Sequence, residues 1–175
     1  MQRREFHRIG TVLLGAAMGL VLAVPGVAYV LSPVLRDRRK SKETGGFQPL
    51  ARLHDLEPDR PKSFPVIEER RDAWVLYPRE PVGSVWLIRQ KDDSVLAFSA
   101  ECPHLGCAVG LGPDGRSFFC PCHTSSFDLS GKKTNAVPPR GMDALDVEVS
   151  KGPDPMVSVR FQRFRIGTEE RKPLG

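Results

Sequence analysis

The clearest feature of this sequence is where charge is lacking. The formal net charge is +5, but residues 1–40 carry seven Lys or Arg and two acidic residues, leaving 19 of the 26 bases and 19 of the 21 acids for residues 41–175. A nucleic-acid-binding domain needs a basic cluster on its folded part. The neutral balance after residue 40 therefore excludes nucleic acid as a partner.

Charge is absent altogether from Ile9 to Leu35, a run of 27 mostly apolar residues. Roughly 20 such residues cross the hydrocarbon core of a bilayer, so we expect a transmembrane anchor over residues 9–35. A cleaved signal peptide is the alternative, since "GVA" before Tyr29 is acceptable as a cleavage site. The run is about twice as long as an ordinary signal core, which favours a retained anchor.

The polar segments on either side of this run bear on its orientation in the membrane. Basic residues flank both ends, so their count does not orient the span. The segment "RREFHR" resembles the twin-arginine export signal, although a generic basic flank is the alternative. The resemblance predicts that residues 1–8 stay in the cytoplasm and that the chain crosses a bacterial cytoplasmic membrane once, with its bulk on the outer side. Residues 36–46, "RDRRKSKETGG", are polar and predict a flexible tether.

Long amphipathic helices and internal repeats are lacking after residue 40. Short strand-like segments punctuated by Pro, Gly and Asp predict instead an antiparallel β domain over residues 47–175. The candidate strands are Trp74–Tyr77, Val85–Arg89, Val95–Ser99, Phe118–Cys120, Leu145–Val149 and Val157–Phe161. "KDDS", residues 91–94, predicts a hairpin turn, and the proline-rich residues 58–65 are typical of turns.

Cysteine is scarce, and all four cysteines lie in two short segments, "CPHLGC" (residues 102–107) and "FFCPCHTSSF" (residues 118–127). Four cysteines indicate two disulfides, a metal site or a mixture. Cys102 with His104, and Cys120 with His123, each offer one thiolate and one imidazole. Zinc accepts such a Cys2His2 set, but zinc leaves the extra cysteine in each segment unexplained.

The pattern C-x-H-x-x-C followed by C-x-C-H resembles the Rieske iron–sulfur proteins, in particular the cluster subunit of cytochrome bc complexes. The resemblance implies the all-β Rieske fold, in which antiparallel sheets carry an inserted cluster-binding subdomain, here with its loops at about residues 100–129 and one N-terminal transmembrane helix before it. It also implies a Rieske-type [2Fe–2S] cluster, with Cys102 and Cys120 on one iron and His104 and His123 on the other. A Cys107–Cys122 disulfide is implied as well. Such a bond persists outside the reducing cytosol, and the cytosolic Rieske ferredoxins of ring-hydroxylating oxygenases lack this cysteine pair.

Other positions in the two segments are interpreted through the same resemblance. The family usually has "CPCHGSxY", and this chain has "CPCHTSSF". Ser125 aligns with the serine whose hydroxyl donates to a cluster sulfide and raises its reduction potential. Phe127 replaces a tyrosine that donates to a cysteine ligand, which predicts a lower potential, one suited to menaquinol. Thr124 replaces the usual glycine.

Two apolar features match surfaces around the cluster. Leu105 matches the loop tip that docks at the quinol pocket. Residues 136–140, with Pro138 and Pro139, match the proline-rich loop that covers the cluster, for which an ordinary strand connection is the alternative.

The resemblance implies a Rieske subunit of a quinol–cytochrome c oxidoreductase. Its partners would be a cytochrome b subunit, a c-type cytochrome, membrane quinol and the lipid bilayer. His123 and His104 would be the catalytic residues, with the exposed Nε2 of His123 accepting a hydrogen bond and then a proton from quinol, as the cluster takes one electron. One alternative is the small Rieske subunit of an exported molybdenum oxidoreductase of the arsenite-oxidase kind. A more remote alternative is a membrane-tethered zinc module.

Overall fold

The computed structural model describes residues 3–40, 46–72 and 75–174, and the chain divides into two compact units, Met1–Thr44 and Gly45–Gly175. In the first unit, helix α1 runs from Arg3 to Lys40. Its part from Arg3 to Ser32 is long and apolar enough to cross a membrane. Apolar side chains such as Val12, Leu14 and Leu22 are exposed along it, which suits a helix surrounded by lipid. The helix therefore fits a single-pass membrane anchor.

Helix α1 also extends further than the sequence predicted. Residues 36–40, assigned to a flexible tether over 36–46, are helical. Arg and Lys have high helix propensity, so a basic run that follows an apolar helix can continue it. The tether prediction is wrong for residues 36–40, and its residues 41–45 lie outside the described part of the chain.

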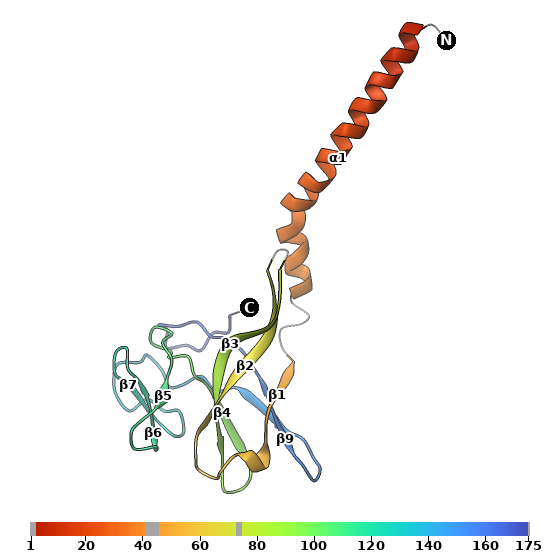
Figure 1. The fold of residues 1–175 in the computed structure, drawn as a ribbon. Helices are drawn as coiled ribbons and strands as arrows, with labels where there is room; N and C mark the ends of the chain where they lie inside the picture. The colour runs from red at the N-terminus through yellow and green to blue at the C-terminus, as the bar shows by residue number, and fades with distance from the viewer. Residues whose placement is uncertain (1–2, 41–45, 73–74, 175) are drawn as a thin grey trace. The chain divides into compact units, whose positions relative to one another are not determined.

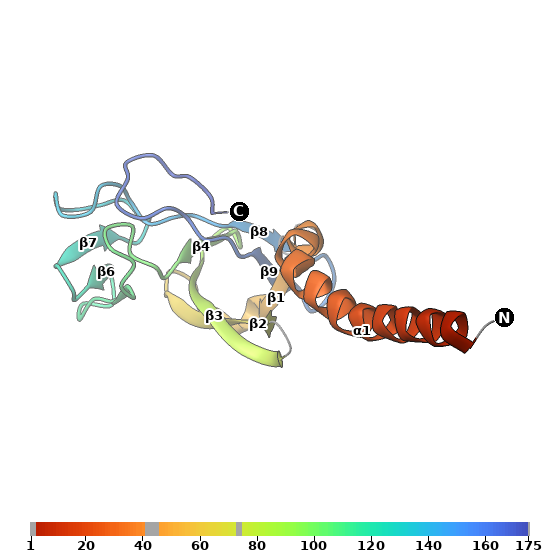
Figure 2. The same ribbon diagram turned by 90° about the horizontal axis from the view of Figure 1, so that it is seen from above.

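The described residues of the second unit form three antiparallel sheets of three strands each. The first has the order β1 (Phe47–Arg52), β9 (Met156–Arg160), β8 (Asp146–Val149), and the second β2 (Lys62–Asp72), β3 (Val75–Arg89), β4 (Val95–Ser99). The third, β5 (Gly110–Leu111), β6 (Ser117–Cys120), β7 (Ser125–Asp128), is inserted in the chain between β4 and β8. It lies at one end of the unit, away from β1 and β9 (Figures 1 and 2). The expected all-β architecture with an inserted subdomain is confirmed.

Strand β3 separates two apolar clusters. Val85 and Leu87 have no exposed surface and belong to the first cluster, whereas Ile88 belongs to the second and Trp86 packs against it. This alternation follows from the two-residue period of a strand. Each fully buried aliphatic side chain contributes roughly 1.5–3 kcal/mol. Because the second cluster also contains Cys102 and Cys120, the core on this face of β3 supports the cysteine-bearing segments.

The predicted strands agree with the structure in part. Residues Val85–Arg89 pair with Val95–Ser99 around the predicted turn, which confirms the hairpin. Trp74–Tyr77 is not a separate strand, since Val75–Tyr77 belong to the long β3 and Trp74 lies outside the described residues. The turn predicted at 58–65 is wrong from Lys62 onward, because β2 begins there and includes Pro65. β2 is at the edge of its sheet, where a residue without an N–H is tolerated.

Candidate metal centre

The first cysteine segment forms the loop between β4 and β5, and this loop closes on itself. The Gly106 amide donates to the Cys102 carbonyl at 2.8 Å, and the Cys102 amide donates to the Cys107 carbonyl at 2.8 Å. Gly106 has φ +79°, a left-handed conformation that glycine adopts without steric cost. The closed loop leaves His104 half-buried and Leu105 54% exposed at its tip.

The second segment is the hairpin loop between β6 and β7. Cys120 ends β6 and pairs with Ser125, which begins β7. Between them, Thr124 has φ +62°, a conformation that costs a non-glycine residue about 1–2 kcal/mol. The Asn135 side chain donates to the Thr124 carbonyl at 2.7 Å, and the Thr124 hydroxyl donates to the His123 carbonyl at 2.6 Å. These bonds hold the turn that leaves His123 exposed.

A disulfide joins the two loops. Cys107 and Cys122 are bonded, with their Cα atoms 6.5 Å apart, as the resemblance implied. The rings of His104 and His123 lie side by side, with centroids 4.9 Å apart and planes at 86°. The two segments therefore present their imidazoles together although 18 residues separate the two histidines.

The two cysteines outside the disulfide, Cys102 and Cys120, are free thiols and buried. Burial raises the pKa of the Cys120 thiol and the neighbouring Cys102 thiol raises it further, while hydrogen bonds from the amides of Cys122 and His123 act in the opposite direction. Metal binding would displace this proton, because the ligand is the thiolate. The Cys120 sulfur also lies within 4.8 Å of the sulfurs of Cys107 and Cys122, but those two are bonded to each other and offer no thiolate.

Two residues of β7 lie behind the loops. Ser125 has no exposed surface, and its Oγ is buried without a hydrogen-bond partner. A buried hydroxyl without a partner costs about 1–3 kcal/mol, which indicates an acceptor that belongs to a bound group. Phe127 is also fully buried, and it lies in the second apolar cluster.

The proline loop at residues 136–140 is held by a residue that the sequence analysis did not single out. Pro138 is buried, and Lys133 Nζ donates to the carbonyls of Pro138 and Pro139 at 3.2 and 3.1 Å. Asn135, which ties the second loop, was also missed, although asparagine is a frequent turn residue. No local signal marks Lys133, since its role depends on carbonyls five and six residues further on.

The chain is similar to known proteins over most of its β unit and beyond. The family model described as Rieske [2Fe-2S] domain matches residues 46–147. The menaquinol:cytochrome c reductase iron-sulfur subunit of Geobacillus thermodenitrificans is 30% identical over 86% of this chain and 87% of its own length. The protein of the same name in Bacillus subtilis (strain 168) is 29% identical over 87% and 89%. Among solved structures, the plasma membrane Rieske protein PetC3 of Synechocystis PCC 6803 is 28% identical, with a TM-score of 0.38, over 47% of this chain and 83% of that one.

Proposed function

Because the chain belongs to the Rieske [2Fe-2S] domain family, we propose that it passes electrons from a membrane quinol to a c-type cytochrome, as the iron–sulfur subunit of a cytochrome bc complex. The two relatives from Geobacillus thermodenitrificans and Bacillus subtilis, which cover 86% and 87% of this chain, are subunits of menaquinol:cytochrome c reductases, so menaquinol is the quinol that we propose. The phenylalanine at position 127 supports this choice. Without a hydroxyl donor at that position the potential should be lower, as a stronger reductant such as menaquinol allows.

The residues at the two loops fit the family's cluster. Two free, buried thiols and two adjacent imidazoles make the mixed donor set of a Rieske-type [2Fe–2S] cluster. Cys102 and Cys120 would hold one iron, and His104 and His123 the other. A cluster sulfide would also give the buried Ser125 hydroxyl the acceptor that it lacks within the protein. A zinc ion would use the same four donors but leave that hydroxyl without a partner.

The exposed residues of the two loops have proposed roles in the oxidation of quinol. When bound, the cluster accepts one electron at a potential in the range known for Rieske centres, roughly −150 to +300 mV. Leu105, at the exposed loop tip, would enter the quinol pocket of the cytochrome b subunit. His123, the more exposed imidazole, would accept a hydrogen bond from the quinol hydroxyl and then its proton, with His104 beside it. His123 would release that proton on the outer side of the membrane once the electron has moved on to the cytochrome. A less negative cluster would attract the imidazole proton less strongly.

The function can be tested with the protein isolated from its membrane. We expect iron, acid-labile sulfide, a cytochrome b partner, and cytochrome c reduction driven by a short-chain menaquinol. His123→Ala should abolish both the cluster's paramagnetic resonance spectrum and this activity. His54→Ala is the matched control, because His54 lies in the short helix Leu53–Asp55, where its ring contacts Asp55 and Asp154. A preparation without iron and sulfide, or a His123→Ala variant with full activity, would contradict the proposal.

A further inference from the structure

The C-terminal segment, residues 163–174, lies beyond residue 147, where the family match ends, yet it is folded back on itself. The Arg165 amide donates to the Lys172 carbonyl, and the Leu174 amide donates to the Arg163 carbonyl, both at 2.8 Å. Phe164 is 4% exposed and belongs to the first apolar cluster. The segment is therefore a closed loop with one end fixed in the core.

This segment contacts the loop that carries His104. The Gly167 amide donates to the carbonyl of Pro103, the residue before His104, at 2.9 Å. The Ile166 side chain lies against Gly106, where an added Cβ would be 3.6 Å from Ile166 Cδ1. Because both contacts depend on the backbone path of residues 103–106, movement of the segment would displace His104 and Leu105.

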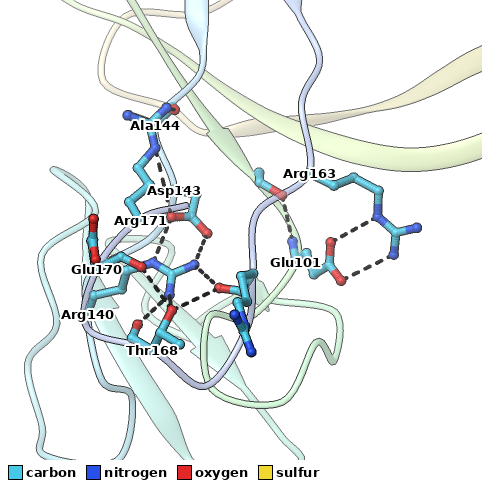
Figure 3. Close-up of polar contacts among 10 residues, drawn as sticks. Glu101, Arg140, Asp143, Ala144, Arg163, Thr168, Glu170 and Arg171 are labelled. Atoms are coloured by element: carbon cyan, nitrogen blue, oxygen red, sulfur yellow. Dashed lines mark hydrogen bonds and ion pairs between the residues drawn. The ribbon is translucent and has the colours of Figure 1, made fainter. Parts of the chain in front are cut away.

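Arg140 holds the C-terminal segment in place. Its Nε and Nη2 donate to the two carboxylate oxygens of Asp143 at 2.9 and 2.8 Å, and both side chains are nearly buried, 10% and 6% exposed. The same guanidinium donates to the carbonyls of Arg165 and Thr168, which flank Gly167 (Figure 3). A planar guanidinium can serve a carboxylate and two carbonyls at once, whereas an ammonium cannot match this geometry.

Arg140 also directly follows Pro139 of the proline loop, so its side chain connects the proline loop to the C-terminal segment, which in turn contacts the loop of His104 through the Gly167 amide. We propose that Arg140, oriented by Asp143, is a positioning residue: it holds the C-terminal segment so that Gly167 keeps the His104–Leu105 loop in its quinol-binding conformation. The inference rests on the proposed function for its effect on quinol, but not for its effect on the loop.

A different ion pair, which joins the C-terminal segment to the loop of His104, serves as a control. Arg163 and Glu101 approach to 3.3 Å (Figure 3), but the Arg163 side chain is 58% exposed. Exposed pairs contribute little, because water screens them and long side chains lose freedom on pairing. Arg140→Lys and Arg163→Lys both keep the charge, so a difference between them reflects geometry and not net charge.

Hydrogen exchange of the full-length, cluster-loaded protein tests the inference. In Arg140→Lys we expect the amides of Gly106 and Gly167 to exchange about tenfold faster, while the amides of Val85–Arg89 in β3 stay protected and report an intact fold. In the complex, the KM for a short-chain menaquinol should rise about fivefold with kcat within about twofold, because the binding-competent loop is only partly populated. Arg163→Lys should change neither. Unchanged exchange in Arg140→Lys, or equal effects in both variants, would overturn the inference.

A second variant keeps the test decisive if Arg140→Lys does not fold. A chain that ends at Phe164 keeps the Arg140–Asp143 pair and the buried ring, and lacks the Gly167 amide. Its Gly106 amide should exchange faster, and unchanged protection there would also overturn the inference. If the wild-type complex does not oxidise menaquinol, the proposed function fails, whereas the exchange data still decide what Arg140 does.

Discussion

Phe127 lies directly opposite Phe118 across the ladder between β6 and β7, and neither ring has any exposed surface. The pair is packed in the second apolar cluster together with Cys102 and Cys120, the two free thiols. The Phe127 ring is shielded from water and packs in the same cluster as the proposed ligands Cys102 and Cys120. Phenylalanine has no hydroxyl, so it cannot donate a hydrogen bond to these ligands.

Phe127→Tyr should raise the midpoint potential. A hydroxyl that donates to a ligand sulfur stabilises the reduced, more negative cluster. One net hydrogen bond of about 0.5–1.5 kcal/mol corresponds to a shift on the order of 20–60 mV for one electron. Redox titration measures it, with Phe118→Tyr as the control that adds a hydroxyl on the opposite strand. An unchanged or lower midpoint in Phe127→Tyr would refute the prediction.

Ser125→Ala should lower the midpoint potential by a similar amount, through loss of a donor to the cluster. The cluster-free protein should keep its stability or gain some, because the Ser125 hydroxyl has no partner within the protein. Ser126→Ala is the neighbouring control, since the Ser126 hydroxyl donates to the Thr124 carbonyl at 3.3 Å. Redox titration and thermal unfolding together decide the matter, and a marked loss of stability in cluster-free Ser125→Ala would contradict this assignment.

Thr124→Gly should raise the free energy of unfolding by up to about 1 kcal/mol. Glycine relieves a left-handed conformation that costs about 1–2 kcal/mol, offset by about 0.5–1 kcal/mol of extra backbone entropy and by the loss of the Thr124 hydroxyl bond to the His123 carbonyl. Thr124→Val keeps the strain and loses the hydroxyl bond to the His123 carbonyl, so it should be less stable than wild type by about 1 kcal/mol. Denaturant unfolding gives the order, and a valine variant as stable as the glycine one would show that strain at this turn is unimportant.

Replacing both Cys107 and Cys122 by serine should destabilise the β unit by about 3 kcal/mol. The disulfide joins cysteines that are 15 residues apart in the sequence. A cross-link over a loop of this length restricts the unfolded chain and so raises its free energy by about 3 kcal/mol. Thermal unfolding of wild type with and without reductant should reproduce the difference. If the double variant and the oxidised wild type unfold at the same temperature, the bond does not stabilise the loops.

The stability contributed by Asp128 should depend on pH. Burial raises the pKa of its carboxyl, but hydrogen bonds from the Ser130 hydroxyl and from the amides of Lys132 and Ser130 outweigh burial and leave the pKa below its ordinary value. A group with a lowered pKa in the folded state stabilises the protein above its unfolded pKa of about 3.9, and this contribution is lost as the pH falls through the folded pKa. Asp128→Asn should therefore be less stable than wild type at pH 7 and should approach it in acid. Ser130→Ala, which keeps the amide bonds, should show a smaller loss, and a loss independent of pH would contradict the role of the charge.

Much of the molecule could be predicted from short patterns in the chain. The apolar run indicated the membrane-spanning helix, the turn at residues 91–94 indicated the hairpin of β3 and β4, and the spacing of Cys and His in two loops indicated the family. Each of these signals depends on residues that are close in sequence, so local propensity and spacing were enough. Strand limits were less accurate, as Pro65 in β2 shows, because the tolerance for proline depends on whether the strand lies at a sheet edge.

The arrangement around the loops was decided by tertiary structure. The turn at Thr124 is held by the Asn135 side chain, and the Ser125 hydroxyl lacks a partner because of the residues that surround it in the core. The Pro103 carbonyl accepts a hydrogen bond from the Gly167 amide, 64 residues later. Arg140 and Asp143 are neighbours in sequence, but the carbonyls that complete their contacts belong to a segment more than 20 residues away. Such contacts form between groups that only the folded backbone brings together, and the free energy that selects them comes from burial and hydrogen-bond geometry, neither of which a local pattern records.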